Sequence, residues 1–277
     1  MRISPLLLSA ALLASMPVMA ATNADAPKAP APTPAAAPAV SPAATTAPAA
    51  SVFSDAQRSE IENVVKEYLT QKNPEVIMQA MQELKKRQEA DSDAKSKSAI
   101  TSNKDKLYND PNSPVGGNPK GDVTVVEFFD YQCGYCKMSQ PTVEKLIKED
   151  KNVKVVYKEF PILGPASTTA TKAALASVKQ NKYEKLHEAL MTEKGHFTDD
   201  IVYKIAKDAG LDVEKLKKDM NDPSIDKMIE ANIALGTEIG ARGTPTFIIN
   251  DELFPGAMEY PQLKKAVEDA RTAGKKP

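Results

Sequence analysis

The fold of this chain is decided by the stretch Val123-Thr124-Val125-Val126-Glu127-Phe128-Phe129-Asp130-Tyr131-Gln132-Cys133-Gly134-Tyr135-Cys136-Lys137. Its first half is rich in β-branched and aromatic residues, which predicts a buried strand. A helical apolar spacing begins at the cysteines and continues through Met138, Val143, Leu146 and Ile147. Cys133 therefore lies at the amino end of a helix, where unpaired N–H groups and the helix dipole stabilise a thiolate. Such placement lowers a thiol pKa from about 8.5 to roughly 3.5–7.5.

The spacing of the cysteines favours redox chemistry over three alternatives. Zinc needs about four ligands, whereas the chain has two cysteines in all and its two histidines, His187 and His196, lie far off in sequence. Covalent haem attachment needs a histidine directly after the second cysteine, where Lys137 stands. A purely structural disulfide would close too short a loop to constrain the unfolded chain much. We therefore expect no metal and no cofactor other than a redox-active Cys133–Cys136 disulfide.

The cysteine motif resembles the active site of the DsbA family of bacterial periplasmic thiol:disulfide oxidoreductases. A second stretch, Gly243-Thr244-Pro245-Thr246-Phe247-Ile248-Ile249-Asn250, resembles the cis-proline loop and following strand of that family. Between the two motifs, five segments from 166 to 235 carry helical periodicity, which is more helix than a thioredoxin core holds. The resemblance implies an α/β thioredoxin fold with an inserted helical domain at about 163–236, and a cis peptide bond before Pro245.

Four residues are candidates for the chemistry itself. Cys133 is predicted to be the nucleophile and Cys136 the resolving thiol, with exchange running through a mixed disulfide. Glu127 matches a buried acid that assists proton transfer at Cys136 in the DsbA family, although a purely structural carboxylate fits the sequence equally well. Because a buried carboxylate generally needs a partner, Lys158 is predicted to be its charge partner.

Four further residues are candidates for substrate binding. The resemblance implies that Thr244 and Pro245 face the sulfur atoms and hold the substrate backbone in an extended form. Gly134 and Tyr135 stand between the cysteines, and this dipeptide resembles that of the DsbC isomerases, as does Thr244 before the proline. DsbA-type oxidases usually carry Pro-His and Val at these places. The body of the chain therefore resembles DsbA, while the details of its site resemble an isomerase.

The remainder of the chain divides by composition. Residues 1–20 are typical of a signal peptide, with Arg2, an apolar middle and a small-residue cleavage site. Residues 21–50 are almost wholly Ala, Pro and Thr and predict a disordered linker. Residues 51–87 predict two short helices, 88–109 a solvated, charged helical linker, and 110–277 the DsbA-like domain.

The helices of 51–87 each carry an apolar stripe that needs covering. Packing on the catalytic domain is one solution. Self-association is favoured, because the long polar segment that follows separates these helices from that domain. An all-helical oligomerisation segment is therefore expected before the α/β domain, giving a homodimer or alternatively a trimer.

These features predict a periplasmic protein that forms or isomerises disulfides in exported cysteine-containing proteins, with an oxidase or reductase of the inner membrane as redox partner. The alternatives are a monomeric DsbA-type oxidase, a copper-handling protein that uses the same thiols, and a holdase chaperone. The charges, 36 basic and 37 acidic residues, give no support for nucleic-acid binding.

Overall fold

The computed structural model describes residues 52–274. The predicted signal peptide (1–20) and the predicted Ala/Pro-rich linker (21–50) lie outside the described residues. The chain divides into two units between Glu62 and Asn63, and each is described by itself. No helix within residues 52–274 is long and apolar enough to cross a membrane.

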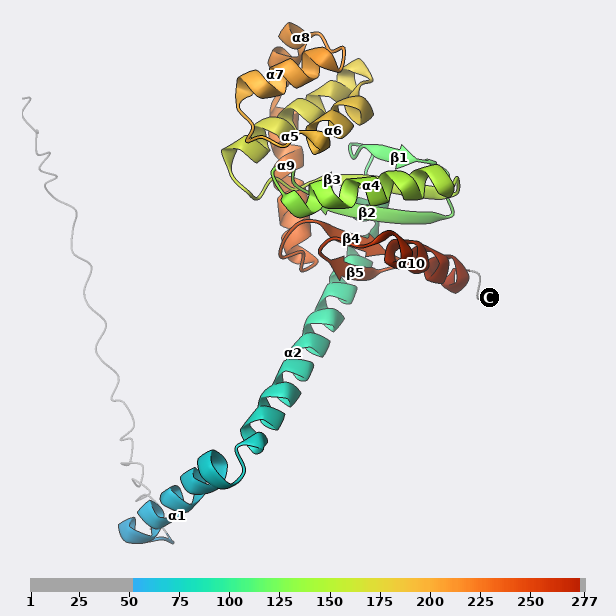
Figure 1. The fold of residues 1–277 in the computed structure, drawn as a ribbon. Coiled ribbons are helices and arrows are strands. Elements are labelled where there is room, and N and C mark those ends of the chain that lie inside the picture. The colour runs from blue at the N-terminus through green and yellow to red at the C-terminus, as the bar shows by residue number, and fades with distance from the viewer. Residues whose placement is uncertain (1–51, 275–277) are drawn as a thin grey trace, which may run out of the picture. The chain divides into compact units, whose positions relative to one another are not determined.

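The second unit is built on a five-stranded mixed sheet with the order β1-β3-β2-β4-β5 (Figure 1). Central β2 (Val123–Phe129) pairs in parallel with β3 (Val153–Glu159) and antiparallel with β4 (Thr246–Ile249). The edge strands, β1 (Val115–Gly117) and β5 (Glu252–Pro255), are both antiparallel to their neighbours. Parallel strands need a crossover connection, which here contains the helix that begins at the cysteine motif, α4 (Gly134–Glu149).

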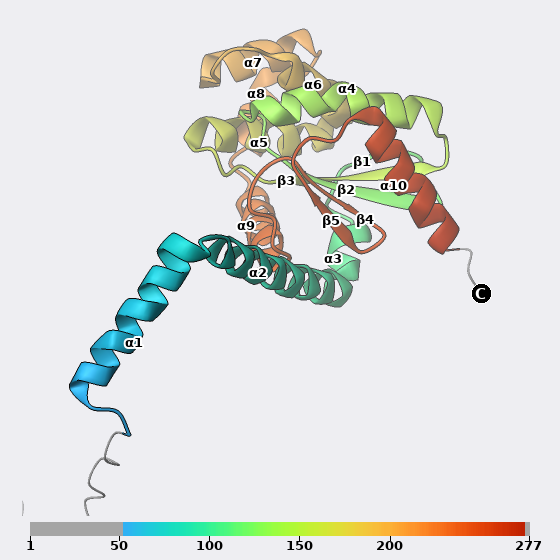
Figure 2. The ribbon, with the colours of Figure 1, turned by 60° about the horizontal axis from the view of Figure 1, so that its bottom comes forward.

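Helices cover both faces of the sheet (Figure 2). On one face, α4 and α10 (Tyr260–Ala273) pack against Val125 and Phe129 of β2. On the other face, α9 (Pro223–Glu238), α3 (Lys104–Tyr108) and the end of α2 (Glu75–Ser102) pack against Val126 and Phe128. Side chains alternate between the two faces of a strand, and a strand buried on both faces needs an almost continuous apolar sequence. This requirement explains the composition of β2.

A group of helices is inserted between β3 and β4 and lies at one end of the sheet (Figure 1). Three of its helices begin at side chains that accept a backbone hydrogen bond, namely Thr198, Asp212 and Asp222. The members before α9 are α5 (Pro165–Ser177), η2 (Val178–Gln180), α6 (Tyr183–Thr192), α7 (Asp199–Asp208) and α8 (Val213–Asp219). A thioredoxin fold with an inserted helical domain is therefore confirmed, and it follows a helical N-terminal segment as expected.

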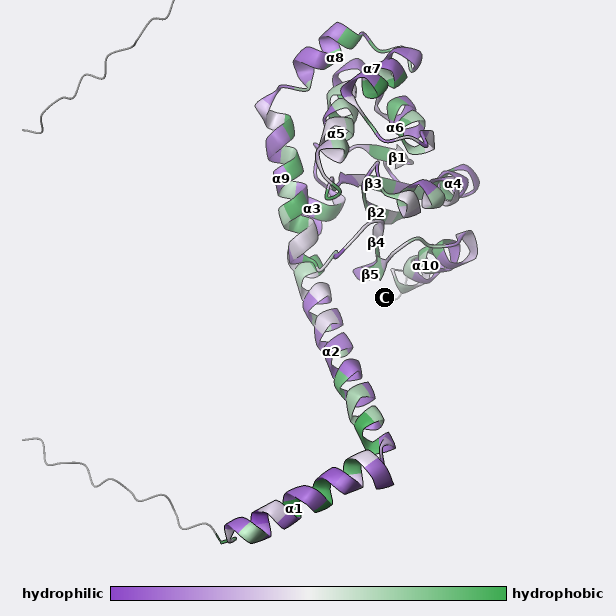
Figure 3. Ribbon diagram, turned by 60° about the vertical axis from the view of Figure 1, so that its left-hand side comes forward, coloured by the Kyte–Doolittle hydropathy of each residue, from purple (hydrophilic) through white to green (hydrophobic). Residues whose placement is uncertain are grey.

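That N-terminal segment consists of α1 (Asp55–Glu67), a π-helical turn η1 (Tyr68–Lys72) and the first part of α2. Their hydrophobic residues are visible in Figure 3 and are largely exposed in the single chain. The exposed set comprises Ile61, Val64, Val65, Tyr68, Val76, Ile77, Met78, Met81 and Leu84.

The predicted boundary of the charged linker is wrong at its carboxyl end. Helix α2 continues past residue 87 to Ser102, and Ile100 and Leu107 have no exposed surface. A Cβ added to Gly240 would lie 2.6 Å from Ser96 Oγ, so the helix approaches that loop too closely for a side chain there. Because this contact is made by a serine and a glycine, it leaves no hydrophobic periodicity by which the sequence could predict it. The last turns of α2 therefore belong to the core of the DsbA-like domain.

Candidate active site

Cys133 is the N-cap of α4, with an extended backbone, and is only 7% exposed, while Cys136 in the first turn has no exposed surface. Both thiols are free, so this is the dithiol form. The Sγ of Cys133 lies 3.1 Å from the carbonyl oxygen of Thr244, to which it donates a hydrogen bond when it is protonated. The turn before α4 is held by Asp130, whose carboxylate accepts from the N–H groups of Gln132 and Leu163.

The two thiols differ widely in acidity. A hydrogen bond from the Cys136 thiol, together with the backbone N–H groups of Tyr135 and Cys136, outweighs burial and lowers the pKa of Cys133 to about 5. Burial raises the pKa of Cys136 far above its usual value, and the negative charges of Cys133 and Glu127 act in the same direction. Near neutral pH, Cys133 is therefore a thiolate and Cys136 a thiol, as the predicted roles require.

The predicted substrate-binding residues surround Cys133. The Thr244–Pro245 peptide bond is cis, as predicted. Thr244 meets the nucleophile as expected: its side chain is a hydrogen-bond partner that helps to lower the pKa of Cys133, and its carbonyl oxygen lies 3.1 Å from the sulfur. Gly134 begins α4 with open space where a Cβ would be, and Tyr135 is 66% exposed beside the thiols.

Glu127 lies on β2, on the face that α4 covers, and has no exposed surface. Among the described residues, neither of its carboxyl oxygens has a hydrogen-bond partner. Burial raises the pKa of Glu127 to about 8, so the carboxyl group is mostly protonated at neutral pH. When Glu127 is ionised, its charge raises the pKa of Cys136, which agrees with the position of the acid expected from the DsbA resemblance.

The predicted ion pair between Lys158 and Glu127 is wrong. In the parallel register Glu127 lies opposite Tyr157, while Lys158 lies opposite Phe128 and so points to the other face of the sheet. There the buried Lys158 Nζ donates to Asp110 Oδ2 at 2.9 Å and to Ser113 Oγ at 2.7 Å. Lys158 is therefore removed from the thiol site by strand alternation, and nothing in the structure supports a catalytic role for it.

The sequence analysis missed a buried polar cluster beside the site. Glu159 accepts hydrogen bonds from Tyr131, Thr171 and Tyr183, each at 2.9 Å. The Tyr131 hydroxyl also lies 3.0 Å from Nδ1 of His187, a buried histidine. Burial raises the pKa of Glu159 to about 8 against the effect of its three donors. Through Tyr131, the cluster joins the turn before Cys133 to the helical domain. Its one sequence signal was an acid at the end of an apolar strand.

Comparison with known proteins agrees with this geometry. Residues 124–268 match the family described as "DSBA-like thioredoxin domain", and residues 57–91 match the "Copper resistance protein ScsC N-terminal domain". Since the first match covers more than half of the sequence, the chain belongs to the DsbA-like family, a class of thiol:disulfide oxidoreductases.

Solved structures resemble this chain over differing shares of its length. A thioredoxin-like oxidoreductase from Silicibacter pomeroyi is 49% identical, with a TM-score of 0.60, and the match covers 61% of this chain and 97% of that one. The Proteus mirabilis ScsC in a transitional conformation is 30% identical, with a TM-score of 0.60, over 80% of this chain and all of that one.

Curated relatives match a little over half of the chain. The Disulfide bond formation protein D of Bacillus subtilis is 26% identical over 56% of this chain and 75% of its own length. A Na(+)/H(+) antiporter NhaA of Salinispora arenicola is 27% identical, but the match spans only 24% of that protein. The chain thus spans about a quarter of the length of these antiporter relatives.

Proposed function

We propose that this chain is an exported thiol:disulfide interchange protein that acts on the disulfides of exported cysteine-containing proteins. The observation that carries the proposal is the cysteine pair itself, with an acidic Cys133 at the helix start and a buried, weakly acidic Cys136 beside it. The predicted signal peptide supports export.

The Cys133 thiolate attacks one sulfur of a substrate disulfide, forms a mixed disulfide and expels the other substrate sulfur as a thiolate. Cys136 then loses its proton and attacks Cys133 Sγ, which forms the Cys133–Cys136 disulfide and releases the second substrate thiolate. Glu127 is the proposed proton carrier for Cys136. The reverse sequence oxidises a dithiol substrate, and an inner-membrane oxidase or reductase would set the direction.

The test of these roles uses two variants. Cys133→Ser should abolish exchange, whereas Cys136→Ser should accumulate mixed disulfides because no resolving thiol remains. Iodoacetamide at mildly acidic pH should alkylate Cys133 first in the reduced wild type. Alkylation of Cys136 before Cys133 would contradict the assignment.

We further propose that the chain is an oligomer with isomerase or mixed activity. The support is the Gly134-Tyr135 dipeptide, and the row of exposed apolar residues on α1 and the first part of α2. A second copy of this chain would cover that row, and two sites facing one substrate would raise the effective concentration of the attacking thiolate. A dimer is the first expectation and a trimer the second.

The oligomer is tested by deleting residues 51–87, which lie before the part of α2 that joins the catalytic core. The deletion should give a folded monomer that keeps dithiol oxidation and loses most isomerisation of scrambled disulfides. A matched full-length control carries Val64→Asp and Met81→Asp, which change exposed side chains only. Sedimentation of a monomeric full-length wild type, or a deletion protein that isomerises at the full rate, would refute this proposal.

A second candidate function is the binding of Cu(I) by Cys133 and Cys136. Thiolates are soft ligands that prefer this ion, and the N-terminal match is to a family named for copper resistance. Titration of the reduced protein with Cu(I) tests it. The candidate fails if the double Cys→Ser variant binds as tightly as the wild type. The same double variant in an aggregation assay tests the holdase alternative.

A further inference from the structure

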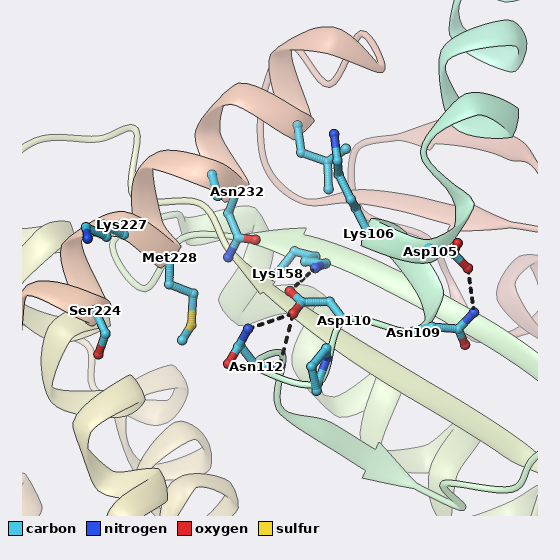
Figure 4. Close-up of a pocket in the computed structure, with 13 residues that line it drawn as sticks. Asp105, Lys106, Asn109, Asp110, Asn112, Lys158, Ser224, Lys227, Met228 and Asn232 are labelled. Atoms are coloured by element: carbon cyan, nitrogen blue, oxygen red, sulfur yellow. Dashed lines mark hydrogen bonds and ion pairs between the residues drawn. The ribbon is translucent and has the colours of Figure 1, made fainter.

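A cavity of about 590 Å³ lies on the side of the protein to which Lys158 points. Its walls are the segment from α3 to β1, Lys158 of β3, and α9 (Figure 4). Since Lys158 projects to the face opposite α4, the sheet separates this cavity from the thiols. Its volume falls within the roughly 300–1,000 Å³ of ordinary small-molecule sites.

The feature that points to a ligand is Asn232 of α9. This residue is only 4% exposed, yet its side chain has no hydrogen-bond partner anywhere in residues 52–274. Figure 4 shows its amide directed into the cavity, toward Lys158 and Asp110. The amide atoms of Asn232 are not among the fully enclosed polar atoms that lack a partner, so they reach the open space of the cavity, where an occupant can bind them. Asn232 thus offers a free donor and a free acceptor to whatever occupies the cavity.

The charges around the cavity favour a negatively charged occupant. Lys158 and Asp110 neutralise each other, since the Asp110 carboxylate is fully engaged by Lys158, Ser113 and Asn112. Of the remaining groups, Lys227 has no ion-pair partner within the described range, and Lys106 donates only to an amide oxygen, that of Asn103.

Asp105 is the one other carboxylate among the residues that line the cavity. Three lysines against two aspartates therefore leave a surplus of one positive charge. The ammonium of Lys158 also uses only two of its three N–H donors, for Asp110 and Ser113.

One side of the cavity is apolar. Met228, Ala231 and Leu235 line it from α9, and Pro111 lines it from the opposite segment. Met228 can adjust to an irregular partner because its side chain is unbranched and polarizable. An apolar wall with a few convergent polar groups is the usual composition of a small-molecule site.

We propose that this cavity binds a small organic acid, with its carboxylate between the amide of Asn232 and the ammonium groups of Lys158 and Lys227 and its compact apolar body against Met228 and Leu235. The site is independent of the thiols and of the proposed exchange activity. A carboxylate fits the Asn232 amide and the lysine ammonium groups together, because it accepts from an amide N–H and from an ammonium at once.

The proposal is tested with three probes of one shape and different charge, namely 4-phenylbutyrate, 4-phenylbutanol and 4-phenylbutylamine. Binding to the full-length reduced protein is followed by NMR at the side-chain amide of Asn232 and the backbone of α9. The acid should bind about tenfold tighter than the alcohol and the amine. Absence of any shift at α9 with about 10 mM acid, or equal affinity for all three probes, would overturn the proposal.

Two variants and a control locate the site. Asn232→Leu keeps the volume of the side chain and removes its amide, so acid binding should weaken about tenfold. Lys227→Gln changes an exposed side chain and should remove most of the preference for acid over alcohol. Lys120→Gln changes an exposed side chain that does not line the cavity, so it should change nothing. Unaltered binding in Asn232→Leu contradicts the role of its amide. If that variant does not fold, an unchanged preference in Lys227→Gln is the refuting result.

Discussion

The hydrogen bond between the two thiols should be the main reason that Cys133 is acidic. The Cys136 thiol is the largest of the influences that bring the pKa of Cys133 down to about 5. A hydrogen bond to a charged group contributes about 1.5–3 kcal/mol, and 1.36 kcal/mol corresponds to one pKa unit. Replacing Cys136 by alanine removes this donor, so the thiolate is less stable and the pKa of Cys133 should rise by about 1 to 2.

The measurement is the pH dependence of iodoacetamide alkylation of Cys133, checked against the ultraviolet absorbance of the thiolate. At pH 6 the wild type should be about nine-tenths thiolate, and Cys136→Ala between about a tenth and a half. Cys136→Ser is the matched control, because its hydroxyl can still donate to the sulfur. Its midpoint should stay closer to the wild-type value than that of the alanine variant.

Two results would refute this reasoning. If Cys136→Ala leaves the pKa of Cys133 at its wild-type value, the thiol donor is not the cause, and the backbone N–H groups at the start of α4 suffice. If the serine and alanine variants raise the pKa equally, the effect comes from repacking rather than from a donated hydrogen bond.

Three further predictions concern stability and are measured by urea unfolding of the dithiol form. Glu127 has a pKa of about 8 when folded against 4.5 ordinarily, so the wild type loses stability as the pH rises through this range. The free energy of unfolding of Glu127→Gln, relative to that of the wild type, should therefore rise by about 3 kcal/mol from pH 4 to pH 7. The same difference between variant and wild type at both pH values would refute a buried, protonated Glu127. Glu159→Ala leaves three buried hydroxyls without their acceptor and should lose about 3–5 kcal/mol, whereas Glu159→Gln, which still accepts, should lose less than half of that; equal losses would argue against the hydrogen bonds. Ile100→Ala should cost about 2–5 kcal/mol, because it opens a cavity in the core, whereas Met81→Ala on the same helix should cost less than about 0.5 kcal/mol. Similar small losses for both would mean that the end of α2 is not part of the core.

The sequence by itself was enough to locate the fold and the reacting atoms. The run from Val123 to Phe129, the CxxC turn and the cis-proline loop are local patterns, and each depends on neighbouring residues for its structure. A continuous apolar run, helix-start chemistry and the restricted backbone of Pro245 act over a few residues. The central strand and the thiols at the start of α4 could therefore be predicted without knowledge of the rest of the molecule, and the cis bond from the resemblance to the DsbA family.

Only the tertiary structure decided which buried charges meet. Lys158 and Glu127 are both buried in neighbouring strands, and the sequence suggested a pair. The register of β2 against β3 turns them to opposite faces, so Lys158 finds Asp110, 48 residues away along the chain. The same limit applies to the end of α2, where Ile100 enters the core and Ser96 lies against Gly240. Pairing of this kind depends on strand register and on the approach of distant segments, and neither leaves a periodic signal in the order of the residues.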